Sequence, residues 1–242
     1  MGSKQHSVRT STPEFLEQKK RSWENNRAST PEKRAAARRI LGDVYDGVPV
    51  FDAIKNHPLP ASEGGGYVGK AFVVAEYRSM VEAGEMDPDP ALLEKIRMKP
   101  MRTLSGVTTV TVLTQPYPCP GECIFCPTDY RMPKSYLADE PGAMRALHHD
   151  FDPYDQVRSR LESLENIGHP TDKIELLILG GTWSSYRKDY QEWFVLRCFE
   201  AMNGLQSDTP ADGPGPDTAG RRERLLSAQT YNETGPHRNV GL

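Results

Sequence analysis

The sequence lacks three features that would place the chain outside the cytoplasm. It has no apolar run long enough to cross a membrane, and residues 1–10 are polar, without the apolar core of a secretory signal. Only four cysteines occur in 242 residues, three of them clustered, which does not suit a secreted disulfide scaffold. We therefore expect a cytoplasmic protein in a reducing compartment, with no membrane partner.

The sequence also lacks a strong excess of charge. Its formal net charge is −3 at pH 7, so an affinity for nucleic acid would need a local basic surface. With 37% hydrophobic residues the chain can bury a core, and its 20 glycines and 20 prolines indicate many loops. A chain of this length holds one large or two modest domains.

Three of the four cysteines, Cys119, Cys123 and Cys126, lie within eight residues of one another. They cannot all pair as disulfides, and the surrounding prolines and Gly121 keep the segment from forming a helix. Thiolates select zinc, copper(I) or iron–sulfur clusters. Three thiols without a fourth nearby favour a 4Fe–4S cluster in which one iron has no protein ligand. The amine and carboxylate of an amino acid can bind that iron, and C-x3-C-x2-C is the signature of radical S-adenosylmethionine (SAM) enzymes.

Two other interpretations of the cysteine cluster stay open. One is a zinc site that takes His148 or His149 as its fourth ligand, and the other is a set of plain buried thiols. Both histidines also suit a solvated loop. Cys198 is different, because it lies in an apolar helical pattern that indicates a core thiol.

Residues 1 to about 60 are basic and predicted to be helical. Between Met1 and Ile40 there are ten Lys or Arg and four Glu. Pro13 and Pro31 each follow a Thr and precede a Glu, which is typical of a helix start. These charges suit either a solvated helix face or a surface that contacts phosphates. The candidates for phosphate contact are Lys19, Lys20, Arg21, Lys33, Arg34, Arg38 and Arg39.

The apolar runs Val107–Leu113 and Ile174–Leu179 predict two parallel strands buried on both faces. A helix over Pro153–Gly168 separates them, and another is expected over Tyr190–Met202. The order βαβα predicts the α/β class with a parallel sheet. Before these strands, the pattern also predicts a helix over Tyr67–Met86.

The end of the sequence predicts one loop, one helix and the start of a strand. Segment 207–220 is rich in Pro, Gly and Asp and is expected to be disordered or a loose loop. Glu223–Glu233 is expected to be helical, and Arg238–Leu242 looks like the opening of a third strand. Because a sheet of two strands and a fragment would have bare edges, we expect a truncated chain.

Gly180, Gly181 and Thr182 follow the second strand, at the end of the sheet where α/β barrels keep their chemistry. Glycines there let a ligand approach the backbone, and a tight strand-to-helix turn also explains them. Thr182 also suits a helix N-cap. Glu140 and Asp152 are expected to be caps or loop anchors.

Together these segments resemble the Elongator protein 3 family, the catalytic subunits of tRNA wobble-uridine modification. The resemblance extends over about residues 100 to 200 and resumes near residue 232. The matching stretches are Arg102–Val107, Pro116–Gly121, Cys123–Pro127, Glu140–Pro141, Met144–Ala146, Asp152–Tyr154, Gly168–His169, Asp172–Lys173, Gly180–Thr182, Asn232–Thr234 and Val240–Leu242.

The resemblance implies a fold and an activity. The fold is a partial radical SAM (β/α) barrel over residues 101–242, truncated, and preceded by a small basic all-helical domain over residues 1–100. The activity uses SAM and acetyl-CoA to place a carboxymethyl group on C5 of the tRNA wobble uridine. The acetyltransferase domain of the family has no counterpart in this sequence. The alternative is therefore a non-catalytic tRNA-binding module with a zinc- or cluster-stapled loop.

The resemblance also implies roles for single residues. The cysteines of the cluster would bind the 4Fe–4S cluster, and Lys173 would be catalytic and contact acetyl-CoA. Phe125 would sit by the adenine of SAM, although it equally suits packing over the cluster. The segment Gly180–Thr182 would approach the methionine part of SAM. The basic N-terminal helices match the tRNA-binding region of the family, and the implied partners are tRNA and either further copies of the chain or Elongator-type subunits.

Overall fold

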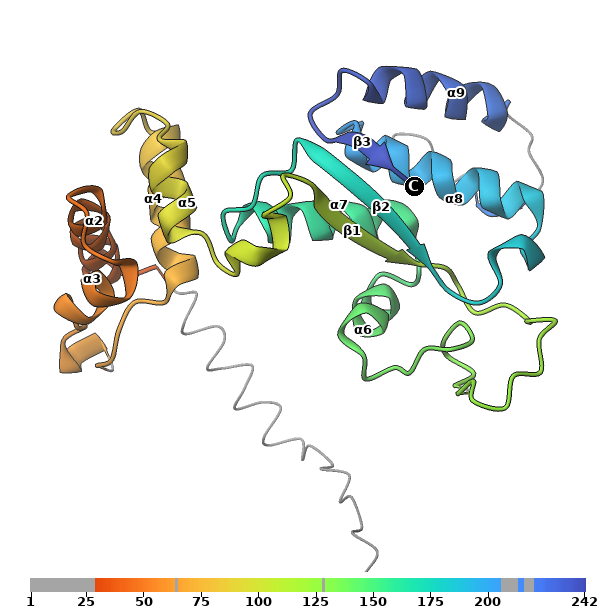
Figure 1. The fold of residues 1–242 in the computed structure, drawn as a ribbon, viewed down its shortest axis with the longest axis horizontal. Coiled ribbons are helices and arrows are strands. Elements are labelled where there is room, and N and C mark those ends of the chain that lie inside the picture. The colour runs from red at the N-terminus through yellow and green to blue at the C-terminus, as the bar shows by residue number, and fades with distance from the viewer. Residues whose placement is uncertain (1–28, 64, 128, 206–212, 216–219) are drawn as a thin grey trace, which may run out of the picture. The chain divides into compact units, whose positions relative to one another are not determined.

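The computed structural model describes residues 29–63, 65–127, 129–205, 213–215 and 220–242. The chain divides into two compact units, called unit 1 (residues 1–97) and unit 2 (residues 98–242) here. Figure 1 shows that the described part of unit 1 is helical, whereas unit 2 contains the sheet.

Unit 1 contains the helices α2 (Pro31–Tyr45), α3 (Val50–Asn56), α4 (Lys70–Glu82) and α5 (Pro90–Ile96). The predicted start at Thr30 is confirmed, because its hydroxyl accepts a hydrogen bond from the amide of Lys33 at 3.3 Å and Pro31 opens the helix. The predicted start at Pro13 lies outside the described residues.

The helix expected over Tyr67–Met86 is shorter in the structure. It begins after Gly69, and its C-terminal end is followed by Gly84, which has φ +70. The core of unit 1 forms where the apolar faces of its four described helices meet, with Ala53 of α3 among the buried residues. It includes Ile40, Leu41 and Val44 of α2, Val73, Val74 and Tyr77 of α4, and Leu92 and Ile96 of α5.

Unit 2 is built on a three-stranded parallel sheet with the order β1-β2-β3. The strands are β1 (Thr108–Leu113), β2 (Lys173–Leu179) and β3 (Arg238–Gly241). The helices are α6 (Pro141–His148), α7 (Pro153–Glu165), α8 (Lys188–Met202) and α9 (Arg221–Asn232). The predicted parallel α/β class and the third strand are thus confirmed.

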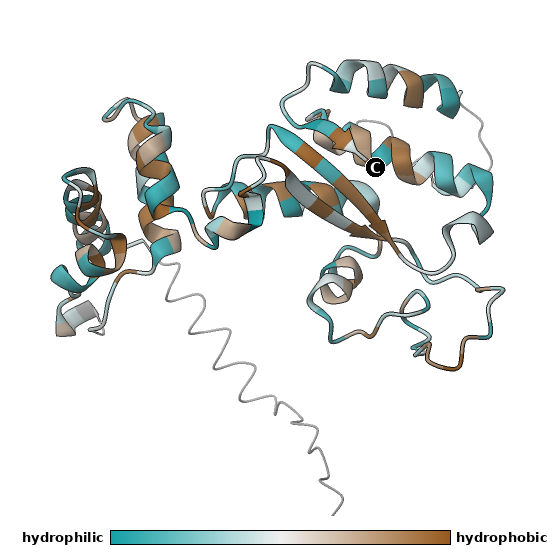
Figure 2. Ribbon diagram, viewed as in Figure 1, coloured by the Kyte–Doolittle hydropathy of each residue, from teal (hydrophilic) through white to brown (hydrophobic). Residues whose placement is uncertain are grey.

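The two long strands are not buried on both faces, as their apolar runs suggested. Val110 and Ile174 are completely buried under α7 and α8, whereas Thr109, Glu175 and Leu177 are exposed. Successive side chains of a strand point to opposite faces, and the described helices α7 and α8 pack on one of them. Figure 2 shows the hydrophobic residues running along β2 to its carboxyl end.

Helix α6 has no counterpart among the predicted elements, because residues 128–152 read as one polar stretch. Pro141 opens this helix, and Ala143 and Ala146 are buried in a small cluster with Leu113 and Leu179. Two alanines three positions apart give too weak an apolar pattern to stand out in the sequence. His148, expected in a loop, is instead the exposed last residue of α6.

The outer edge of β1 is covered at its carboxyl end by one side chain. The amide of Leu113 donates to Gln156 Oε1 at 3.0 Å, and Gln156 Nε2 donates to the carbonyl of Leu113 at 3.0 Å. Gln156 is buried on α7, so both polar groups of this edge residue are satisfied without another strand.

The loop expected over residues 207–220 is only partly described, since residues 206–212 and 216–219 lie outside the described ranges. The buried Arg221 of α9 donates to the carbonyls of Gly213 and Gly215, so this part of the loop is anchored. Among the described residues, no helix combines the length and apolar character that crossing a membrane requires.

Candidate functional site

The cysteine loop leaves the carboxyl end of β1, and Gly180–Thr182 leaves the carboxyl end of β2. Because β1 and β2 are parallel and in register from Thr108 to Leu113, both segments emerge at the same edge of the sheet. The structure brings them into contact, since Cys119 Sγ lies 3.3 Å from Thr182 Oγ1. Part of the predicted site is therefore assembled from two separate segments.

Two of the three sulfurs lie near Gly121, and the third lies near Ser135. A Cβ atom placed on Gly121 would lie 3.6 Å from both Cys119 Sγ and Cys123 Sγ, while Cys126 Sγ lies 3.4 Å from Ser135 Oγ. All three thiols are free, and none is buried. Within the described ranges, no three His, Cys, Asp or Glu side chains converge as they would around a single metal ion. This holds in the described chain for the three cysteines by themselves and for the cysteines with His148 or His149.

The loop favours the thiolate form of one cysteine. The Thr182 hydroxyl and then the amide of Gly121 hydrogen-bond to the sulfur of Cys119 and lower the pKa of this thiol, and the charge of Lys134 adds to the effect. Thiolates are the form in which cysteines bind metals. Three accessible thiols on one loop, one of them favoured as a thiolate, are a donor set that fits an iron–sulfur cluster.

Two tyrosines hold the start of the cysteine loop. Tyr186 Oη donates to the carbonyl of Gln115 at 2.9 Å and lies 2.8 Å from Thr114 Oγ1, while the amide of Gln115 donates to Tyr190 Oη at 3.0 Å. Burial raises the pKa of both phenols, so they stay protonated at neutral pH. The ring of Tyr117 packs on Tyr186 with 4.8 Å between centroids.

Sequence reasoning missed these anchoring tyrosines. Their four-residue spacing before and within a helix is a signal that they share a side, but nothing local connects them to the loop. Their contacts bridge about 70 positions along the chain.

Gly180 and Gly181 have different surroundings. A Cβ atom on Gly180 would overlap Thr114 Oγ1, so the close approach of the two strand ends by itself requires glycine there. On Gly181 it would lie 3.7 Å from the side chain of Lys134, an ordinary contact. Thr182 precedes the 3₁₀ helix Trp183–Ser185, but its side chain makes no capping bond and instead contacts Cys119.

Other candidate residues take positions that the sequence foresaw in part. Cys198 is completely buried, which confirms the core thiol. Asp152 caps α7 by accepting from the amide of Asp155, as expected. Glu140 makes no capping bond to α6, but its carboxylate accepts from the amide of Leu137 at 3.4 Å and so anchors the preceding loop. Phe125 is 92% exposed, so in this structure it does not pack over the cysteines.

Lys173 does not belong to the group around the cysteines. It is the exposed first residue of β2 and pairs in register with Arg238 of β3. A seven-residue strand with a rise of about 3.3 Å per residue places it roughly 20 Å from Gly180. The two ends of β2 therefore carry separate parts of the predicted site.

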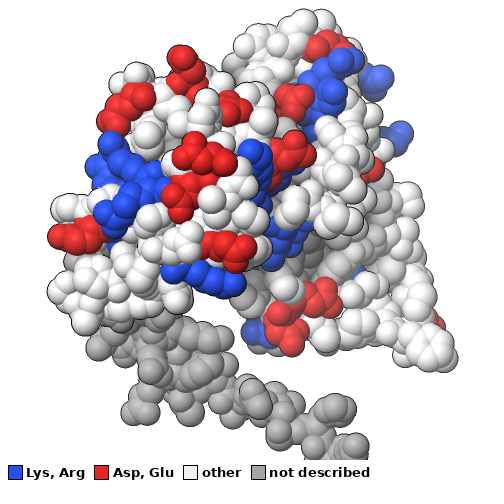
Figure 3. Space-filling view, turned by 60° about the vertical axis from the view of Figure 1, so that its left-hand side comes forward, with Lys and Arg blue, Asp and Glu red and all other residues white. Residues whose placement is uncertain are grey.

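The predicted phosphate-contacting residues of unit 1 are also divided. Lys19, Lys20 and Arg21 lie outside the described residues. Arg34 and Arg38 both pair with the buried carboxylate of Glu76, at 3.1 Å and 2.7 Å. Figure 3 shows Lys and Arg groups interspersed with Asp and Glu groups on the face it presents.

Arg38 also pairs with Glu85 at 2.8 Å, and its hydrogen bonds to Glu76 and Glu85 raise its pKa. Together with Arg34 it links α2 to α4 and to the turn after α4. Lys33 is half-buried, and Arg39 is exposed on the same helix. Of the described candidates, Arg34 and Arg38 are thus engaged within unit 1.

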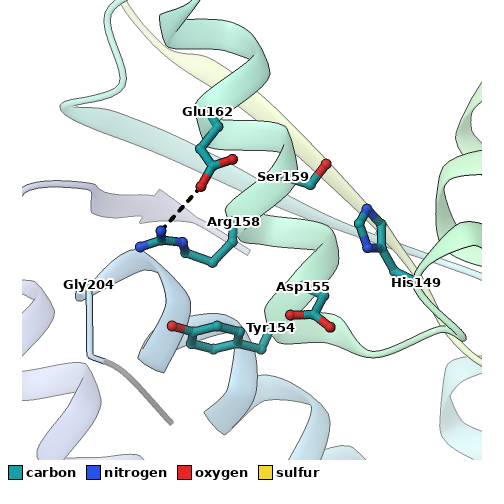
Figure 4. Close-up of a pocket in the computed structure, with 7 residues that line it drawn as sticks. All are labelled: His149, Tyr154, Asp155, Arg158, Ser159, Glu162 and Gly204. Carbon is teal, nitrogen blue, oxygen red and sulfur yellow. Dashed lines mark hydrogen bonds and ion pairs between the residues drawn. The ribbon is translucent and has the colours of Figure 1, made fainter.

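An open polar depression of about 500 Å³ lies along α7, away from the cysteine loop. Figure 4 shows its lining residues, among which Arg158 pairs with Glu162 at 3.2 Å. His149 and Tyr154 line it, but no residue of the cysteine loop or of Gly180–Thr182 does. This depression is therefore not the candidate site.

Known proteins were compared with the whole chain, which includes the cysteine loop and Gly180–Thr182. No protein-family model matches the chain. A protein of Methanocaldococcus infernus named tRNA uridine(34) acetyltransferase is 46% identical over 157 residues, which is 62% of this chain and 27% of that protein. Elongator complex protein 3 of Saccharomyces cerevisiae is 38% identical over 128 residues, which is 48% of this chain and 23% of that protein.

The predicted resemblance to the Elongator protein 3 family is confirmed. A solved structure of Methanocaldococcus infernus Elp3 with an N-terminal deletion is 36% identical and covers 56% of this chain and 21% of that one, with a TM-score of 0.36. The matches span about a quarter of the length of these two relatives.

Proposed function

We propose that this chain contributes the SAM-binding part of a radical SAM enzyme that modifies C5 of the wobble uridine of tRNA. The observation that carries the proposal is the meeting of two segments at one sheet edge, where Cys119 contacts Thr182. The names of the relatives support tRNA uridine as the substrate. The α/β architecture with a parallel sheet is consistent with a partial radical SAM barrel.

In this proposal Cys119, Cys123 and Cys126 hold a 4Fe–4S cluster. When bound, such a cluster supplies an electron that cleaves SAM to a 5′-deoxyadenosyl radical. The three thiols would hold such a cluster without a fourth protein ligand, so the amine and carboxylate of SAM could bind it as well. Phe125, exposed beside Cys126, is available to contact the adenine.

The residues of the chain itself position these ligands. The hydroxyl of Thr182 and the amide of Gly121 stabilise the Cys119 thiolate, which keeps that ligand ready for metal. Tyr186 and Tyr190 fix the first residues of the loop to the end of β1. A Cβ atom placed on Gly181 would lie no closer than 3.7 Å to its neighbours, so there is room beside this backbone for the methionine part of SAM.

Acetyl-CoA is the proposed acyl donor, consistent with the name acetyltransferase carried by the relatives. Lys173 would contact it from the amino end of β2, roughly 20 Å from Gly180 along the strand. Binding of acetyl-CoA there would thus be separable from binding of SAM. Lys173→Ala should weaken the binding of acetyl-CoA, measured by calorimetry, without changing the iron content. Equal binding by the variant would remove Lys173 from the proposal.

The cluster is tested by anaerobic reconstitution of the 242-residue chain and of three single Cys→Ala variants at positions 119, 123 and 126. We expect about four irons per wild-type chain, a paramagnetic signal after reduction, and cleavage of SAM. Each variant should lose most of the iron and all cleavage. Cys198→Ala is the matched control and should keep both, because this thiol is buried in the core. Zinc at one ion per chain without iron, or full iron in the three variants, would refute the proposal.

A further inference from the structure

Three arginines from three separate elements of unit 2 lie close enough for their charges to interact. Arg102 lies on the 3₁₀ helix η2 (Pro100–Thr103), Arg145 on α6 and Arg160 on α7, and all three elements contact β1. Neighbouring residues fix these elements. Thr103 Oγ1 lies 2.9 Å from His169 Nδ1 just after α7, and Ala146 is buried with Leu113.

This arginine trio has no carboxylate partner among the described residues, in which no ion pair or hydrogen bond to any of the three guanidinium groups occurs. Arg145 and Arg160 are half-buried, and Arg102 is exposed. Burial, and then the charges of Arg145 and Arg102, lower the pKa of Arg160 to about 10. Burial and the charge of Arg102 lower the pKa of Arg145 as well.

Guanidinium groups are positively charged in proteins, so the fold holds three like charges near one another. The lowered pKa of Arg145 and of Arg160 means that their charged forms are disfavoured in the folded chain. A neighbouring arginine shows that α7 does pair such groups elsewhere, since Arg158 binds Glu162 four residues on. A charge cluster that destabilises the free chain is typical of a site that is neutralised by a ligand.

We propose that Arg102, Arg145 and Arg160 bind the phosphodiester backbone of RNA. The inference depends on the proposed function, because it assigns part of the tRNA contact to unit 2. Arginine forks match the oxygens of a phosphate, so each guanidinium group can donate two hydrogen bonds to it. A polynucleotide presents several phosphates in a row and can neutralise all three charges. A single phosphate ester carries at most about two negative charges.

The test measures binding of a tRNA to the 242-residue chain by fluorescence anisotropy over a series of salt concentrations. The variants are Arg102→Gln, Arg145→Gln and Arg160→Gln, with Arg158→Gln as the matched control on the same helix. Each of the three should weaken binding about tenfold. Each should also reduce the slope of log Kd against log salt by about 0.7–0.9, the value for one phosphate contact.

Arg158→Gln should keep the wild-type slope, because Glu162 already neutralises that charge. Arg160→Lys keeps a positive charge and should recover most of the slope while recovering less of the affinity. Far-UV circular dichroism of every variant identifies any that fail to fold. Where a Gln variant fails to fold, the Lys variant at the same position is measured in its place.

Three results would overturn the inference. If wild type binds tRNA and the trio variants match Arg158→Gln, the arginine trio is not a contact and the proposed function stands. If wild type binds no tRNA, the inference and the tRNA part of the proposed function fail together. If the trio variants lose binding of coenzyme A, titrated alone, but keep tRNA, the site serves a small phosphorylated ligand instead.

Discussion

One group of arginines in each unit can be compared, and the two groups have opposite surroundings. In unit 1, Arg34 and Arg38 share the buried carboxylate of Glu76, so their charges link two helices. In unit 2, Arg145 and Arg160 are half-buried near each other without a carboxylate in the described chain. The basic sequence of unit 1 thus includes arginines that are already neutralised within the unit, whereas unit 2 has both paired arginines, such as Arg158, and the unpaired trio. A basic segment is a poor guide to an anion site unless the pairing of its charges is known.

The largest expected effect tests whether unit 2 is tightly packed. Loose packing would offer a trivial reason why Arg145 and Arg160 lack a carboxylate partner. Gly180→Ala should destabilise unit 2 by about 3 kcal/mol, because the added methyl overlaps Thr114 Oγ1. Urea unfolding followed by the fluorescence of Trp183 and Trp193 measures this. A small loss in the free energy of unfolding would mean that the ends of β1 and β2 separate easily and that unit 2 is loosely packed.

Two further variants control this experiment. Gly142→Ala places its methyl 3.7 Å from Leu113 Cδ1, an ordinary contact on a helix, and should be neutral or slightly stabilising. Thr114→Ala combined with Gly180→Ala should recover part of the loss, because the overlapping hydroxyl is gone. Additive losses in the double variant would exclude the clash as the cause.

The next effect tests the pairing in unit 1. Glu76→Gln should destabilise this unit by about 2 kcal/mol, less than for a fully buried pair because both arginines are partly exposed. Hydrogen exchange of the amides of α2 and α4 measures the change. Glu85→Gln is the control, since its carboxylate is 44% exposed and should contribute at most about 0.5 kcal/mol. Equal effects of the two variants would contradict the central role of Glu76.

A smaller effect concerns the melting temperature, which should respond differently to the loss of an arginine in each unit. Arg38→Gln should lower the melting temperature, whereas Arg160→Gln should leave it unchanged or raise it by about 2 °C. The pKa of Arg160 is about 10 in the folded chain against an ordinary 12.5. At pH 7 the side chain is charged in both the folded and the unfolded chain, so the cost of this charge to the free energy of unfolding is present in full. The penalty should fade above about pH 10, where the folded state releases the proton first. A loss of stability in Arg160→Gln at pH 7 would show an ordinary structural role.

The smallest effect concerns anions. Sulfate in place of chloride should raise the melting temperature of wild type by about 1–2 °C more than that of Arg160→Gln, because a bound anion relieves the repulsion. Arg158→Gln should respond as wild type does. Differential scanning fluorimetry at matched sulfate concentrations makes the comparison, and identical shifts in all three proteins would count against an anion site at the arginine trio.

Much of the fold could be predicted from the sequence, because the start and type of these helices and strands depend on residues close to them in the chain. The runs that became β1 and β2 are apolar, and the starts at Pro31 and Pro153 follow from capping residues beside them. Gly168 has φ +87, as expected after a helix. The parallel sheet followed from the order of these elements.

The remaining features depend on contacts between distant positions. Glycine at position 180 is required by Thr114, and the charge of Arg38 is matched by Glu76, which lies 38 positions away. No window of sequence contains either pair. The separation of Lys173 from Gly180 was different, because the length of the predicted strand already implied it.

The paired hydrogen bonds between Gln156 and Leu113 have a consequence for how the sheet can grow. A glutamine amide has the same donor and acceptor as a peptide group, so here it takes the place of a neighbouring chain at the rim of β1. Any additional strand is thereby directed to the far rim, beside β3. Replacing Gln156 by leucine would free two backbone groups and invite unwanted pairing between molecules.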